Sequence, residues 1–241
     1  MRLFATDPLI YLILVLGLLL VIGLGFFAQQ QTLMPVLSGL IGWLFLLWAL
    51  RHARPDIGLR IVGVWAATVF LLSLVAGRLL DQQALAAVPG SLDYIAAQML
   101  WLTGQSGAVE QPGVWLAAFA RRAGLLLAGS ILSAGLVPLI AGARYLAVLG
   151  LWMARLFDAP RPAAILFGLA PWVWAEVVAQ VVLVVVLAEP LVTGDAQALV
   201  QGGRRRLLLI GLVALVLAAV LHLVLPGLLV SPLRYFVTGD W

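Results

Sequence analysis

Residues 9–28 read LIYLILVLGLLLVIGLGFFA and contain no charged side chain. A helix that crosses the hydrocarbon core of a bilayer needs roughly 20 consecutive apolar residues, so this stretch predicts a membrane-spanning helix. The whole chain has the same character, with 64% hydrophobic residues, 10% charged residues and a mean hydropathy of +1.15. Ordinary soluble domains carry roughly a quarter charged residues. The sequence therefore predicts an all-α, polytopic integral membrane protein surrounded by the lipid bilayer.

The charged and reactive residues exclude several classes of protein. All fourteen basic residues are arginine, and they stand singly or in twos and threes beside apolar runs. That placement is typical of membrane-flanking arginines, so we expect no nucleic-acid partner even though the pI is about 10.3. The chain has no cysteine, which excludes disulfides and thiolate metal sites.

Five further apolar regions follow the first one. They cover residues 33–50, 61–80, 123–157, 163–188 and 207–230. The region 123–157 is too long for one span at about 1.5 Å per residue, and Pro138, Gly142 and Arg144 interrupt it. We expect it to end near Gly142 with an interfacial continuation, or to form a bent pair whose second piece crosses or re-enters the membrane. The chain then has six or seven spans, with residues 1–50 as a hairpin and 51–241 as a helical bundle.

The loops indicate an orientation for the first half of the chain. Residues 51–60 hold three arginines, which favours the cytoplasmic side and a cytoplasmic N-terminus in a cell inner membrane. Residues 81–122 lack a span-length apolar run and are expected to form a long outer loop. Within them, residues 92–102 have the spacing of a short interfacial or packed helix. The triplet Arg204, Arg205 and Arg206 lies inside only if residues 123–157 cross twice.

Glu176 stands near the middle of the fifth apolar region. A carboxylate at that depth is costly unless it is paired, protonated or hydrated. Trp172, Glu176 and Gln180 are spaced four apart and share one helix face. This face is either an ion, proton or gating site, or a structural hydrogen bond between helices. Arg144 also lies inside an apolar block, so we expect it to pair with Glu176.

His222 is the second of two histidines and lies within the last apolar region. A metal site needs several ligands, so we expect no metal and interpret His222 as a helix-packing or proton-relay residue. The chain lacks the Gly-x-Ser-x-Gly turn, the His-Glu-x-x-His helix and the phosphate-binding loop that mark common hydrolases. We therefore expect a protein that is not an enzyme and carries no cofactor, with ligation of one haem or chlorin by His222 as a minor alternative.

Small residues four apart allow helices to approach closely in lipid. Gly124 with Ala128, and Ser130 with Ala134, follow this spacing. They predict tight contacts within a helical bundle or between copies in an oligomer.

Three patterns in residues 61–241 point to a known family. A span and a long loop lead into an interrupted, small-residue-rich helix that contains Gly-Leu-Val-Pro at residues 135–138. Pro171 is followed five residues later by Glu176, and the last span ends in Ser231 and Pro232. In this order the features resemble the stage II sporulation protein M family of multi-pass membrane proteins.

The chain departs from that family at two points. The family often has His-Gly after the proline, where this chain has Trp172 and Val173, and an acid before Ser-Pro, where Gly227 stands. The resemblance implies a component without enzymatic activity that works beside other membrane proteins.

Two functions follow from these observations. The first, which the sequence favours, is a scaffold or accessory subunit of a larger membrane assembly, with other membrane subunits or further copies of itself as partners. The second is a permease-like subunit, driven by a separate ATPase, with a polar pathway at Glu176 and Arg144. A water-accessible cavity at Glu176 would favour the second.

Overall fold

The computed structural model describes residues 8–52, 54–102, 112–159, 168, 170–195, 197, 199 and 202–238, and the helices within these ranges are accompanied by no strand. Seven of the described helices are long and apolar enough to cross a membrane. They are α1 (Pro8–Ala28), α2 (Leu33–Arg51), α3 (Pro55–Leu80), α6 (Pro112–Leu132), α7 (Leu136–Leu156), α9 (Pro171–Thr193) and α10 (Gly202–Val224). The predicted all-α, polytopic fold is thus confirmed.

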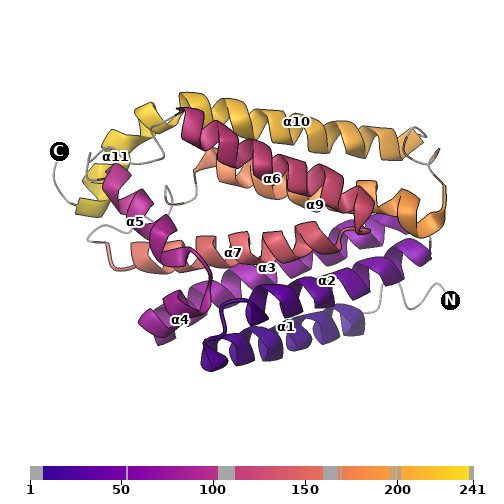
Figure 1. The fold of residues 1–241 in the computed structure, drawn as a ribbon, viewed down its shortest axis with the longest axis horizontal. Helices are drawn as coiled ribbons and strands as arrows, with labels where there is room; N and C mark the ends of the chain where they lie inside the picture. Colours follow the sequence, from indigo (N-terminus) through magenta and orange to yellow (C-terminus); the bar gives the residue numbers. More distant parts are fainter. Residues whose placement is uncertain are drawn as a thin grey trace.

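Three shorter helices lie at one end of the bundle: α4 (Gln82–Ala87), α5 (Ser91–Leu102) and α11 (Pro226–Thr238). We call this the α5 end. The opposite end, which we call the Arg204 end, holds the α2–α3, α6–α7 and α9–α10 connections (Figure 1). The seven long helices alternate in direction between these ends, so α1 begins at the Arg204 end and α10 ends at the α5 end (Figure 1).

The helices form two groups that meet along α7 and α9. The first three helices pack together, and α7 packs along α2 and α3, while α9 packs against α6 and α10 (Figure 1). Prolines at the first positions of α3 and α9 start these helices at little cost, since the first turn needs no N–H donor.

The long fourth apolar region breaks at a turn over residues 133–135, and not at Gly142 as the first of the two predicted arrangements requires. Gly135 there has φ +89°, a left-handed conformation that glycine adopts without steric cost. Gly142 lies inside α7 and Pro138 lies in its first turn, where a proline is tolerated. The region therefore forms two helices, each long and apolar enough to cross a membrane, which gives seven candidate spans.

The expected outer loop at residues 81–122 is shorter than predicted, because α6 already begins at Pro112. Arg121 and Arg122, at the end of the predicted loop, lie within this helix. An apolar run interrupted by two arginines can still span when one arginine finds a partner inside the bundle. The predicted short helix at residues 92–102 is confirmed as α5.

Close contact between α3 and α7 rests on small residues. A Cβ at Gly150 would lie 2.5 Å from the Phe70 carbonyl oxygen, and one at Gly77 would lie 2.7 Å from Ala154 Cβ. Two ion pairs then join the same helices at the α5 end. Asp81 and Arg155 lie 2.6 Å apart, and Arg78 pairs with Asp158.

The Arg204 end contains a buried carboxylate. Glu189 on α9 is 1% exposed, and both of its oxygens contact the Arg204 guanidinium, at 2.6 and 2.9 Å. The contact ties the end of α9 to the start of α10. Nothing in the local sequence pattern around Glu189 marks its partner fifteen residues later.

Candidate functional site

Glu176 of α9 faces α6 inside the bundle. Its carboxylate Oε1 lies 3.1 Å from Nη2 of Arg122, and the Glu176 side chain is 11% exposed. Opposite charges brought together in this way avoid much of the cost of placing either one in lipid. The structure therefore supplies the partner that the Glu176 carboxylate requires.

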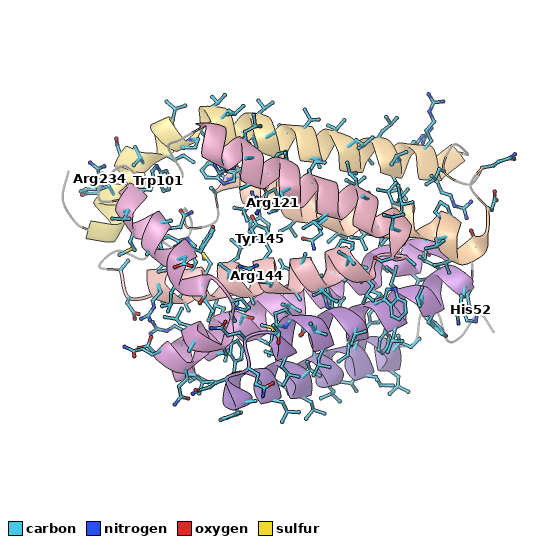
Figure 2. All side chains as sticks on the ribbon, in the orientation of Figure 1. His52, Trp101, Arg121, Arg144, Tyr145 and Arg234 are labelled. Carbon is cyan, nitrogen blue, oxygen red and sulfur yellow. The ribbon has the colours of Figure 1, made fainter. Side chains whose placement is uncertain are left out.

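The prediction that Arg144 pairs with Glu176 is wrong. Its Nε donates a hydrogen bond of 2.8 Å to the carbonyl oxygen of Pro89, in the turn between α4 and α5. Tyr145, the next residue of α7, lines the cavities beside Glu176 instead. Consecutive helical residues point about 100° apart, so only one of the two can face α9; Figure 2 labels both on α7.

Two tyrosines add to the surroundings of the carboxylate. Tyr145 lines the two cavities beside Glu176, and its ring centroid lies 5.6 Å from the Arg122 guanidinium carbon. Tyr94 lies on α5, which covers this region from the α5 end. Burial, followed by the nearby Glu176 carboxylate, raises the pKa of Tyr94 above its ordinary value. Tyr94 therefore remains a protonated phenol and a hydrogen-bond donor at neutral pH.

Gln180 lies one turn beyond Glu176 on α9 and contacts α7. Its Nε2 donates a hydrogen bond of 3.1 Å to the carbonyl oxygen of Pro138. A Cβ at Gly142 would lie 1.5 Å from this nitrogen. The absence of a side chain at Gly142 therefore lets the amide reach a helix carbonyl.

His222 packs between aromatic rings at the α5 end of the site. Its ring stacks on Trp115 with centroids 4.1 Å apart and lies 4.8 Å from the Trp172 ring. Both ring nitrogens of His222 and Nε1 of Trp115 are buried without a hydrogen-bond partner among the described residues. Buried polar groups usually have a hydrogen-bond partner, and these three nitrogens lack one among the described residues.

Two cavities meet at the ion pair. The larger one, about 180 Å³, lies under α5 and is lined by Tyr94, Gln98, Trp115 and His222; we call it the α5 chamber. The smaller one, about 90 Å³, is lined by Leu126, Ala141 and Gln180; we call it the α6–α7 chamber. Arg122, Tyr145 and Glu176 line both chambers.

The predicted packing residues occupy different environments. A Cβ at Gly124 would meet no atom within 4 Å, and Ala128 is also exposed, so within the chain this pair makes no close helix contact. Ser130 is buried and donates to the Leu126 carbonyl oxygen. Ala134 lies in the turn after α6, with φ +50°.

Among the described residues, no group of three or more histidine, cysteine or acidic side chains could hold a metal ion. Comparison of the chain with protein families, with curated proteins and with solved structures finds no match.

Proposed function

We propose that this protein is a permease-like membrane subunit whose solute site is the pair of chambers at Arg122 and Glu176. The observation that carries the proposal is that the ion pair lines both chambers. A solute that moved from one chamber to the other would have to pass between or displace these two side chains. A cavity at Glu176 favours a permease over a scaffold, and the two chambers are such cavities.

The cost of burying charge supports a functional role. Ionisable side chains inside spans are rare and commonly mark solute or ion pathways. A purely structural contact between α6 and α9 needs no charge, because apolar packing of similar volume is often equally stable. Arg122 also lines both chambers, and its side chain is 43% exposed.

The arginine distribution supports an orientation in which the Arg204 end is cytoplasmic. That end carries Arg51, Arg54, Arg60, Arg204, Arg205 and Arg206. At the α5 end, Arg78 and Arg155 are paired with Asp158 and Asp81. An excess of arginine in short loops favours the cytoplasmic side, so the α5 chamber lies towards the outside.

Single cysteines test whether water reaches the chambers, since the natural chain contains no cysteine. Ala118 lines the α5 chamber and Ala141 lines the α6–α7 chamber. Ala128 is exposed on α6 but lines neither chamber, so Ala128→Cys is the matched control. The reagent is a charged methanethiosulfonate, applied to protein in lipid nanodiscs.

The proposal predicts rapid modification of Ala118→Cys and Ala141→Cys and slow modification of Ala128→Cys, because a thiol facing lipid does not ionise. Equal, slow modification of all three would overturn the proposal. The scaffold role and the resemblance to stage II sporulation protein M would then be the remaining predictions, to be tested by mass spectrometry of proteins that copurify in mild detergent.

A further inference from the structure

The α5 chamber holds more hydrogen-bond donors than acceptors. Trp115 is 6% exposed and lines the chamber, and its Nε1–H has no partner among the described residues. An indole nitrogen can only donate. A ligand that satisfies it must therefore offer an acceptor atom, such as an oxygen.

Arg122 supplies further donors to the same chamber. A guanidinium carries five N–H donors, and one contact of 3.1 Å joins it to the Glu176 carboxylate. Arg122 can therefore donate to a second oxygen-bearing group without first losing Glu176.

The remaining walls are aromatic. Trp172, Tyr94 and the ring of His222 line the chamber together with Trp115, and they offer flat apolar surface to the body of a ligand. His222 adds a ring N–H or an acceptor according to its tautomer, and neither of its nitrogens has a partner among the described residues.

We propose, as a refinement that rests on the proposed function, that the α5 chamber binds an oxyanion group, a carboxylate or a phosphate ester, carried on an aromatic or apolar body. Arg122 and the Trp115 N–H bind the oxyanion, and the aromatic walls hold the body. The oxyanion belongs either to a soluble organic acid or to the headgroup of an anionic lipid.

Glu176 opposes such a ligand. It is the one acidic side chain among the described residues that line either chamber. Its negative charge repels a bound anion in a medium of low dielectric constant. Removing that charge should therefore strengthen anion binding, whereas damage to the fold would weaken it.

The test measures equilibrium binding of radiolabelled benzoate and phenyl phosphate to the protein in phosphatidylcholine nanodiscs. We expect saturable binding to the wild type and at least about fivefold tighter binding to Glu176→Gln. The double variant Glu176→Gln with Arg122→Gln leaves no unpaired carboxylate. Its affinity for the probes should be at least about tenfold lower than that of Glu176→Gln, as expected for the loss of a charge-assisted hydrogen bond. Trp115→Phe keeps the ring stack and should weaken binding several-fold.

Arg121→Gln is the matched control. Arg121 is the exposed neighbour of Arg122 on α6 and does not line the chambers (Figure 2). It should bind both probes like the wild type. Added to Glu176→Gln, Arg121→Gln should leave the affinity unchanged. A loss equal to the one that Arg122→Gln causes in that background would overturn the inference, because a general effect of positive charge would then explain both.

A second set of nanodiscs identifies the source of the oxyanion. If phosphatidylglycerol replaces part of the phosphatidylcholine and competes with benzoate in the wild type, the ligand is a lipid headgroup; without competition it is a soluble acid. If neither probe binds and no phosphatidylglycerol is retained, the inference fails. Reactive cysteines at Ala118 and Ala141 would still uphold the proposed function in that case, whereas unreactive cysteines would refute that function whatever the binding result.

Discussion

Arg122 on α6 and Glu176 on α9 lie 3.1 Å apart although 54 positions separate them in the sequence. Their contact joins two helices at the point where two cavities meet. Tyr145 of α7, which lines both cavities and contacts the Arg122 guanidinium, brings in a third helix. The polar centre of the protein is thus built from three helices that come from distant parts of the chain.

The ion pair should contribute measurably to stability. Arg122→Gln leaves the mostly buried Glu176 carboxylate without its cation, so we expect a loss of about 1–3 kcal/mol. Arg121→Gln should change stability by less than about 0.5 kcal/mol. Thermal unfolding in mild detergent compares the two. A double-mutant cycle with Glu176→Gln should give a coupling energy of at least about 0.5 kcal/mol, and a coupling energy of zero would contradict the pairing.

Gly142 should tolerate no side chain while Gln180 is present. A Cβ there would lie 1.5 Å from Gln180 Nε2, so Gly142→Ala should destabilise the protein by about 1–3 kcal/mol through overpacking and loss of the bond to Pro138. Adding Gln180→Ala should restore part of the loss. Gly124→Ala meets no atom within 4 Å and should be neutral or stabilising by about 0.5–1 kcal/mol. Equal effects of the two alanines would refute the close approach.

Breaking the buried pair of Glu189 and Arg204 should lower stability more than breaking the pair of Arg122 and Glu176. Glu189 is 1% exposed and both oxygens contact Arg204. Arg204→Gln leaves a buried charge uncompensated, which costs about 3–5 kcal/mol. Arg205→Gln, at the exposed neighbouring position, serves as the control and should cost less than about 0.5 kcal/mol. The account is wrong here if unfolding temperatures in detergent fall equally for both.

The proposed orientation predicts which connections face outwards. Gln31→Cys, between α1 and α2 at the α5 end, should react with a membrane-impermeant maleimide on intact cells. Asp195→Cys, after α9 at the Arg204 end, should react only after the membrane is opened. The reverse pattern would invert the orientation and place the α5 chamber towards the cytoplasm.

The spans could be predicted because an uninterrupted apolar run has few other stable environments. The start of α6 could not, since Arg121 and Arg122 lower the local hydropathy and the cavity that accommodates Arg122 forms only after folding. The signal available in the sequence was the spacing of four from Ala118 to Arg122 and Leu126, which places these residues on one helix face. In the structure all three line the chambers.

The site was predicted only in part. Glu176 could be singled out because a lone carboxylate in an apolar run is costly wherever the helix lies. Its partner could not be identified, because Arg122 and Arg144 both interrupt apolar stretches and only helix rotation distinguishes them. In the fold, Arg144 reaches the Pro89 carbonyl and Arg122 reaches Glu176. The role of Gly142 likewise depends on Gln180, which is 38 positions away in the sequence.

The modification of Ala141→Cys in sealed, oriented membranes tests the central claim most directly, because this position lines the chamber that shares the ion pair with the α5 chamber. We expect a charged methanethiosulfonate applied at the α5 end to modify it much faster than Ala128→Cys. Prior modification of Ala118→Cys in the double variant should slow that reaction. If Ala141→Cys reacts no faster than Ala128→Cys from either side of the membrane, no solute reaches the ion pair and the account is contradicted.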